Sequence, residues 1–143
     1  MYKLLPSDFA YTYQECKLCY YLKIKHNVPR PSLSMPGVFS AINTRIQTKL
    51  VGQSPKTLSP NLPDGQIVSQ ENFVESTVIP NTSVYIRGKY DLLLQNPDNT
   101  HTLIDLKISQ PGEDKIDKYQ TQLVAYKYAF ENPKTGNPLT ISR

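Results

Sequence analysis

The feature that most constrains the fold of this chain is a strand–turn–strand pattern in its second half. Two apolar stretches, Ser83–Gln95 and His101–Ser109, flank Asn96–Thr100, whose asparagines, proline and aspartate are typical of a tight turn. A preceding stretch, Ile67–Ile79, is rich in β-branched residues and ends at Pro80. The pattern therefore predicts an antiparallel meander of three strands.

Two helices are predicted before the meander. Apolar residues recur at three- and four-residue steps from Ser7, which can cap a helix, to about His26. After a proline-rich loop, a second helix is expected from near Gly37. Its buried stripe is predicted to consist of Ile42, Ile46 and Leu50.

A third helix and a last strand are predicted after the meander. The helix runs from Asp114 to Phe130, with a stripe formed by Ile116, Tyr119, Leu123, Tyr126 and Phe130. Leu139–Ile141 is expected to be a strand parallel to a neighbour, because crossovers through a helix are right-handed. The 143 residues suit a single domain, 1–143, of α/β (α+β) class: a mixed sheet with a three-stranded antiparallel meander, a crossover helix and two N-terminal helices.

The net charge of +4 is unevenly distributed along the chain. Residues 1–50 hold seven Lys/Arg and two Asp/Glu, whereas residues 51–143 hold nine Lys/Arg and ten Asp/Glu. This fits a polyanion-binding flank beside a carboxylate site, and it equally fits an ordinary solvated surface. No apolar run approaches the roughly 18 residues of a membrane helix, and the start lacks a signal-peptide core. We therefore expect a cytoplasmic protein without a membrane contact.

Cys16 and Cys19 are the only two cysteines. Two thiolates do not complete a tetrahedral zinc or iron–sulfur site, which needs four ligands. A disulfide inside one helix is disfavoured because the helix fixes the directions of both side chains. Free thiols in a reducing cytosol are therefore expected.

A pair of carboxylates is predicted at the open end of the central hairpin. Asp98 is the midpoint between Asp91 and Asp105, so a hairpin centred on the turn places these two aspartates directly opposite each other. Their Cβ atoms would lie about 4.5–5.5 Å apart, where like charges repel. A divalent cation converts that repulsion into ligation, and carboxylate oxygens suit Mg²⁺ or Mn²⁺.

Lys107 lies on the same strand face as Asp105, because strand side chains alternate. There it can hold an attacking water or stabilise charge on a phosphate, and the backbone carbonyl of Leu106 can add a metal ligand. The alternative is an exposed surface ion pair between Asp105 and Lys107, which contributes little. The apolar run around Asp105 argues against that alternative, because a charge in a central strand is costly unless it is used or paired.

Gln122 and Tyr126 are four residues apart and lie on one face of the predicted third helix. Gln122 is expected at the edge of the buried stripe, where its amide needs a partner such as Lys107 or a phosphate. The alternative is a solubilising glutamine beside a core tyrosine.

Three motifs occur in a characteristic order: Gly88-Lys89-Tyr90-Asp91, Ile104-Asp105-Leu106-Lys107 and Gln122-Leu123-Val124-Ala125-Tyr126. The set resembles motifs II, III and QxxxY of the RecB-like PD-(D/E)XK nucleases, which include CRISPR-associated exonucleases, and Ser7 to Tyr21 is similar to the opening helix of that family. The resemblance implies a restriction-endonuclease-like core and Mg²⁺- or Mn²⁺-dependent DNA cleavage. It further implies metal ligation by Asp91 and Asp105, catalysis by Lys107, and positioning by Gln122 and Tyr126.

Three departures from the family pattern stand out. Many relatives carry a metal-binding histidine in the second helix, where Asn43, a weaker ligand, is nearest; His26 and His101 are expected at the surface. Cys16 matches the first cysteine of the iron–sulfur branch, but the further cysteines are absent, so no cluster is supported. The sequence also ends at Arg143, soon after the QxxxY helix, which indicates a fragment or a reduced domain.

The residues and the resemblance together predict a nuclease acting on DNA, on single strands or duplex ends. Basic residues of the first helices are expected to hold the DNA backbone, namely Lys17, Lys23, Lys25, Arg30, Arg45 and Lys49. Repair, recombination, CRISPR and phage contexts all use such a domain. The alternative is a catalytically inactive nucleic-acid-binding module on the same fold, and an unrelated small protein would require the motif order to be coincidence.

Overall fold

The computed structural model describes residues 1–31, 36–107, 112 and 116–142. The chain divides into two compact units. The first unit comprises Met1–Ser34, Val74–Gly88 and Gln110–Pro138, and the second comprises Met35–Phe73, Lys89–Ser109 and Leu139–Arg143. The expectation of a single domain stays a prediction, and each unit is described by itself.

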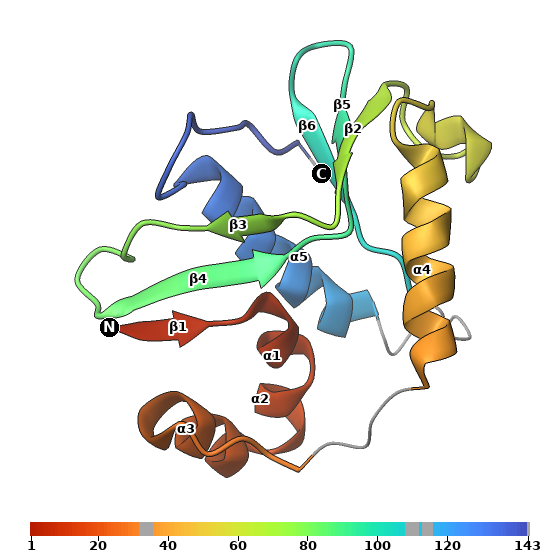
Figure 1. Ribbon diagram of the computed structural model, residues 1–143. Helices are drawn as coiled ribbons and strands as arrows, with labels where there is room; N and C mark the ends of the chain where they lie inside the picture. The colour runs from red at the N-terminus through yellow and green to blue at the C-terminus, as the bar shows by residue number, and fades with distance from the viewer. Residues whose placement is uncertain (32–35, 108–111, 113–115, 143) are drawn as a thin grey trace. The chain divides into compact units, whose positions relative to one another are not determined.

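The first unit contains a three-stranded sheet and four helices (Figure 1). The strand order is β1 (Tyr2–Leu4), β4 (Val84–Lys89) and β3 (Phe73–Glu75), with β1 parallel to β4. The helices are α1 (Pro6–Ala10), α2 (Thr12–Glu15), α3 (Lys17–His26) and α5 (Ile116–Glu131). Helix α1 packs against α5.

The prediction of one continuous helix from Ser7 to His26 is wrong. Helical structure begins at Pro6, with Leu5 as the N-cap and no side-chain cap from Ser7. It is interrupted at Tyr11 and again at Cys16, whose backbone is extended. Three- and four-residue spacing continues across both breaks, so the apolar periodicity does not reveal them.

The prediction of free thiols is also wrong, because Cys16 and Cys19 are joined by a disulfide. Cys16 is the N-cap of α3, and its Sγ accepts a hydrogen bond from the Cys19 backbone N–H at 3.1 Å. The expectation placed both cysteines inside one helix. Cys16 instead lies before the helix, so the helix does not fix its side-chain direction.

Helix α5 buries a face that differs from the predicted stripe. Its buried residues are Gln122, Ala125, Tyr126, Ala129 and Phe130, whereas Ile116 is 62% exposed. Tyr126 and Phe130 are therefore buried as predicted, and Ile116 is not. The predicted first residue, Asp114, lies outside the described residues.

The second unit combines one long helix with an antiparallel sheet. Helix α4 (Gly37–Leu50) begins where predicted, and a short 3-10 turn, Pro55–Thr57, interrupts the connection that follows it. The strand order is β2 (Gln66–Gln70), β5 (Leu92–Gln95) and β6 (His101–Ile104). The core cluster consists of Leu50, Ile67, Leu92 and Leu94, with Ile104 and Leu106 packed against it.

The buried face of α4 is not the predicted isoleucine stripe. Leu50 is buried, but Ile42 is 43% and Ile46 is 41% exposed. Gln47 is instead fully buried. A polar residue therefore occupies the position that faces the sheet, which hydrophobic periodicity does not anticipate.

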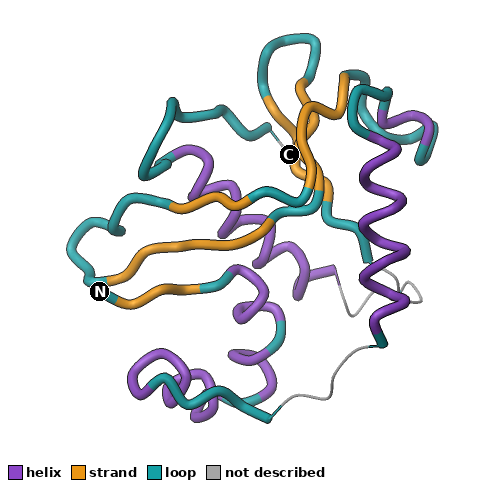
Figure 2. The backbone as a smooth tube through the Cα atoms, viewed as in Figure 1, coloured by secondary structure: helices purple, strands orange, loops and turns teal. Residues whose placement is uncertain are grey.

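The predicted strands are shorter than expected, although the mixed α+β architecture is confirmed. Ile67–Ile79 yields β2 and β3, and Ser83–Gln95 yields β4 and β5 with loop structure between them (Figure 2). The single meander thus becomes parts of two three-stranded sheets. The predicted third strand ends at Ile104 rather than Ser109, and Ser109 lies outside the described residues.

Pairing continues through the interruption between these strands. The Glu71 N–H donates to the Asp91 carbonyl at 2.8 Å, and the Tyr90 N–H donates to the Asn72 carbonyl at 3.1 Å. Glu71 has a left-handed backbone conformation with φ 43°. Such a conformation is unusual for a non-glycine residue, and it marks the irregularity beside Asp91.

The predicted final strand is reduced to one parallel bridge, between His101 and Ile141. The His101 N–H donates to the Thr140 carbonyl and the Ser142 N–H donates to the His101 carbonyl, both at 2.8 Å. The parallel direction is as predicted, but His101 is half-buried rather than a surface residue. Among the described residues, no helix is long and apolar enough to cross a membrane.

Candidate active site

The β5–β6 hairpin has the predicted register. Its pairs run from Gln95 with His101 to Leu92 with Ile104, and every pair is centred on Asp98. The next position outward on this register opposes Asp91 to Asp105. The turn chemistry and the apolar strands were therefore sufficient to predict which residues meet.

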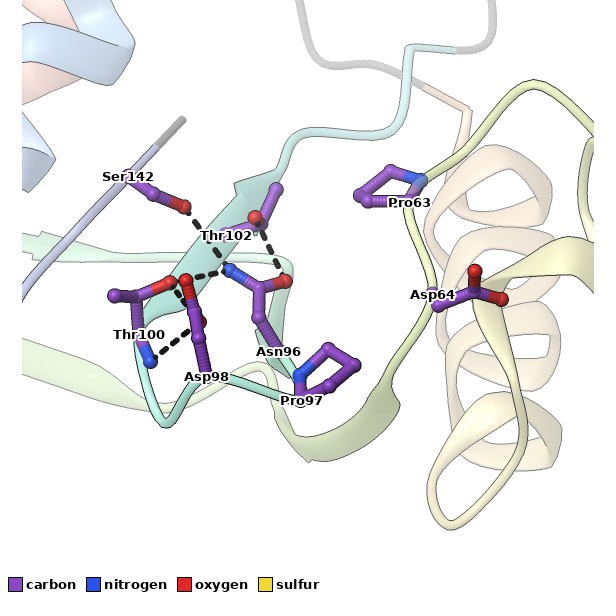
Figure 3. A pocket seen from close by; sticks show the side chains of 8 residues that line it. All are labelled: Pro63, Asp64, Asn96, Pro97, Asp98, Thr100, Thr102 and Ser142. Carbon is purple, nitrogen blue, oxygen red and sulfur yellow. Dashed lines mark hydrogen bonds between the residues drawn. The ribbon is translucent and has the colours of Figure 1, made fainter.

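A hydrogen-bond network at the turn fixes this register (Figure 3). The Asn96 Nδ2 donates to Thr100 Oγ1 at 2.8 Å and to Ser142 Oγ at 3.0 Å, and Thr102 Oγ1 donates to Asn96 Oδ1 at 3.2 Å. These groups line a pocket of about 400 Å³. Hydrogen bonds from Thr100 hold the pKa of Asp98 below its ordinary value. The side-chain polar atoms of Asn96 are all bonded to residues of the hairpin and to Ser142, so we assign this pocket a structural role.

Asp91 lies between β4 and β5 and reaches across the hairpin. Its Oδ2 accepts a hydrogen bond from the Leu106 backbone N–H at 2.8 Å. Burial, the largest influence, raises the pKa of Asp91 above its ordinary value, and the charge of Asp105 adds to the rise, while the Leu106 N–H opposes it. An anion held here is thus poorly solvated and next to a second anion, which is the setting that favours a bound cation.

Asp105 and Lys107 form an ion pair of 2.7 Å between Oδ2 and Nζ. The two residues therefore share one face of the chain, as predicted, although β6 has already ended at Ile104. The side chain of Asp105 is only 11% exposed and that of Lys107 is 28% exposed. The pair is thus partly buried, unlike the exposed surface pair of the alternative interpretation.

The donor atoms available here suit a hard cation. Two carboxylates and the nearby backbone offer only oxygen ligands, which Mg²⁺ and Mn²⁺ prefer. Across the described ranges, no group of three or more His, Cys, Asp or Glu residues is placed to hold a metal. Further ligands would therefore have to come from a carbonyl such as that of Leu106, from an amide, or from water. Asp91 and Asp105 fit a site of this kind.

Helix α4 supplies an amide to this region, but from a different residue than predicted. Asn43 is half-buried on α4, and its role as a weak ligand stays a prediction. Gln47, one turn later, is fully buried, and its side chain slightly lowers the pKa of Asp91, against the larger effect of burial. Sequence reasoning missed Gln47. The available signal was a polar residue four positions after Asn43 and three positions before Leu50.

Gln122 and Tyr126 lie on α5 in the first unit. Both are buried, so Gln122 is not at the edge of the helix face as predicted. A role for either residue beside the carboxylates of the second unit stays a prediction.

All four predicted DNA-binding cations of the first unit contact the protein itself. Lys23 Nζ binds both carboxylate oxygens of the buried Asp8, at 2.6 and 2.7 Å. Arg30 pairs with Glu15 at 2.7 Å. Lys25 contacts the Tyr2 hydroxyl and ring, and Lys17 lies over the Tyr13 ring. Arg45 and Lys49 are exposed on α4.

The sequence matches the model of one known family, the PD-(D/E)XK nuclease superfamily, over residues 38–140. The matched range begins in α4 and covers the hairpin, with Asp91, Asp105 and Lys107, and helix α5. No curated protein matches the chain.

Proposed function

The chain belongs to the PD-(D/E)XK nuclease superfamily, and from this premise we propose that it is a Mg²⁺- or Mn²⁺-dependent deoxyribonuclease. The observation that supports the proposal is the hairpin register, which, continued one position beyond its last pair, Leu92 with Ile104, would oppose Asp91 to Asp105 beside Lys107. In the proposed enzyme, both aspartates ligate the cation, the Leu106 carbonyl adds a ligand, and Asn43 is a weak one.

The proposed reaction is hydrolysis of a phosphodiester bond. A bound divalent cation lowers the pKa of a water molecule and polarises the phosphoryl oxygen. Lys107 Nζ orients the attacking water and stabilises the negative charge that develops on the phosphoryl oxygens. The oxygen of water bonds to phosphorus, the bond to the leaving sugar oxygen breaks, and a proton from water ends on that oxygen. Two products result, one with a terminal phosphate and one with a hydroxyl.

The proposed substrate is DNA, either single-stranded or at duplex ends. Gln122 and Tyr126 position the DNA or the reacting groups in this proposal. Exposed Arg45 and Lys49 on α4 are suited to phosphate contacts, since such cations supply sequence-independent affinity. Exonucleolytic processing in repair, recombination, CRISPR or phage replication would use these properties.

One observation favours a second candidate function, a catalytically inactive nucleic-acid-binding module. Within the described part of the chain, the carboxylates and histidines do not form a group of three. A site with two carboxylates binds a divalent cation more weakly than one with three. Such a module would retain DNA and leave it intact.

The test is a cleavage assay with labelled single- and double-stranded DNA in Mn²⁺, in Mg²⁺ and in EDTA. Asp105→Ala and Lys107→Ala are expected to abolish cleavage in either metal. Lys134→Ala is the matched control, because Lys134 also pairs with a carboxylate, Glu75, at 2.6 Å but is outside the proposed site. Intact DNA after incubation with folded wild-type protein would reject the nuclease, and DNA retention in a gel-shift assay would then support the binding module.

A further inference from the structure

Gln47 is the most unusual buried polar residue of the second unit. It lies on α4 with none of its surface exposed. Neither its Nε2 nor its Oε1 makes a regular hydrogen bond to the protein. A buried amide without partners lowers stability, so an apolar residue would be more favourable here unless the amide serves a purpose.

The neighbours of Gln47 on α4 show where its side chain lies. Thr44, three residues earlier, lies on the same helix face as Gln47, since residues three or four apart are neighbours, and Thr48 is the residue that follows Gln47. Thr44 Oγ1 donates to the Glu71 carboxylate at 3.2 Å, and Gln70 Nε2 donates to Thr48 Oγ1 at 3.1 Å. The face that carries Gln47 therefore packs on the end of β2.

The end of β2 is the part of the sheet that holds Asp91. Gln70 pairs with Leu92, and the Glu71 N–H donates to the Asp91 carbonyl at 2.8 Å. Gln47 thus lies on the helix face that packs beside the residue on which the proposed cation site depends, and the influence of its side chain on Asp91 agrees with this placement.

We propose that Gln47 is a positioning residue of the cation site, whose amide holds the Asp91 carboxylate toward Asp105 and hydrogen-bonds a water molecule of the cation's hydration shell. This inference rests on the proposed function. Mg²⁺ and similar ions usually keep several waters, and such waters need hydrogen-bond partners in the protein. The two unmet polar atoms of Gln47 would then both be satisfied.

The proposal predicts opposite effects on cation binding and on stability. Gln47→Met keeps the length of the side chain and removes both polar atoms. Its melting temperature in EDTA is expected to equal or exceed that of the wild type, because unmet hydrogen-bonding groups are lost. Its dissociation constant for Mn²⁺, measured by titration calorimetry, is expected to rise about 10- to 100-fold.

Two further variants make the test specific. Gln47→Glu keeps an oxygen at the same place and adds a negative charge, so its Mn²⁺ affinity is expected to exceed that of Gln47→Met. Gln70→Met is the matched control, because Gln70 bonds Thr48 of the same helix instead of Asp91. Its Mn²⁺ affinity is expected to equal that of the wild type.

The outcomes separate this inference from the proposed function. Wild-type Mn²⁺ affinity in Gln47→Met, together with a lower melting temperature in EDTA, would show a purely structural role and overturn the inference alone. Absence of Mn²⁺ binding by the folded wild-type protein would overturn the cation site itself, and the role of Gln47 with it.

Discussion

The Asp91 carboxylate accepts a hydrogen bond from the backbone N–H of Leu106 at 2.8 Å. This contact joins the two strands of the hairpin just beyond β5 and β6, whose last pair is Leu92 with Ile104. Beyond the last strand pair, a hydrogen bond to the Asp91 side chain thus takes the place of the next backbone–backbone hydrogen bond. The peptide between Asp105 and Leu106 is fixed in orientation as a result, and the Asp105–Lys107 pair is held next to Asp91.

Replacing Asp91 by asparagine is expected to raise the melting temperature of the cation-free protein at neutral pH. Asparagine keeps an oxygen that accepts the Leu106 N–H but carries no charge. Burial raises the pKa of Asp91 above its ordinary 3.8, so the ionised form destabilises the folded state. The destabilisation by ionised Asp91 is complete at a pH above the pKa of Asp91 in the folded protein. It decreases as the pH falls through that pKa and is absent below the pKa of Asp91 in the unfolded chain.

The measurement is thermal unfolding in EDTA across the acidic to neutral range. The difference between Asp91→Asn and wild type should decline toward zero as the pH falls. A lower melting temperature for the variant at neutral pH, or a difference that does not change with pH, would contradict the account. Mn²⁺ should stabilise the wild type and not the variant.

The register of the site was predictable because two independent signals coincide. The turn residues Asn96–Thr100 fix the centre of the hairpin, and strict alternation along the strands fixes which residues share a face. The position of Lys107 beside Asp105 follows from the same alternation. These features are local, so a single sequence contains them.

The features that escaped prediction are a local break that apolar spacing does not reveal and contacts between residues distant in sequence. Cys16 breaks the N-terminal helix although the apolar spacing continues through it. Gln47 is buried while Ile42 and Ile46 are exposed, and the hydrogen bonds of α4 to Glu71 and Gln70 join residues more than twenty positions apart. The short strand β1 pairs with β4, about eighty residues later. A strand of three residues is too short for its alternation of apolar and polar side chains to be recognised in the sequence.

Lys23→Met is expected to destabilise the protein by about 3–5 kcal/mol, because it leaves the buried carboxylate of Asp8 without its partner. Lys17→Met is the matched control, since Lys17 lies over the ring of Tyr13 and is not ion-paired within the described residues. Chemical denaturation of both variants gives the comparison. If Lys23 instead serves mainly to bind DNA, its variant would lose DNA affinity and retain its stability.

Gly88→Ala is expected to cost about 1–3 kcal/mol of stability through overpacking. A Cβ atom at this position would lie 2.8 Å from Pro6 Cδ and 2.8 Å from Tyr126 Cε1. The first motif therefore needs glycine to leave room for the tyrosine of the third. Gly37→Ala is the control, because no atom of the described residues lies within 4 Å of its added Cβ, and the stability of this variant should be unchanged or higher. If Gly88→Ala were as stable as the wild type, the rings of Pro6 and Tyr126 would have to move to make room for the added Cβ atom.

Tyr20→Phe is expected to leave stability unchanged or raise it at neutral pH. The Tyr20 hydroxyl is buried and has no hydrogen-bond partner in the described structure, while its ring packs edge-on against Tyr13. Burial, with a contribution from the charge of Asp8, raises the pKa of Tyr20 from 10.0 to about 12. Phenylalanine preserves the ring contact and removes only the unsatisfied group.

The pH dependence of this variant gives the sharper test. Because burial disfavours the ionised phenol, Tyr20 destabilises the fold increasingly as the pH rises above its unfolded pKa, and this cost is full above the folded pKa of about 12. Wild-type protein should therefore lose stability relative to Tyr20→Phe in alkaline solution, measured as the difference in melting temperature. Tyr21→Phe, whose ring is half exposed, controls for the loss of one phenol. If Tyr20→Phe were less stable than wild type at neutral pH, the hydroxyl would have to make a hydrogen bond. Removing a hydroxyl lowers stability only when that hydroxyl is hydrogen-bonded.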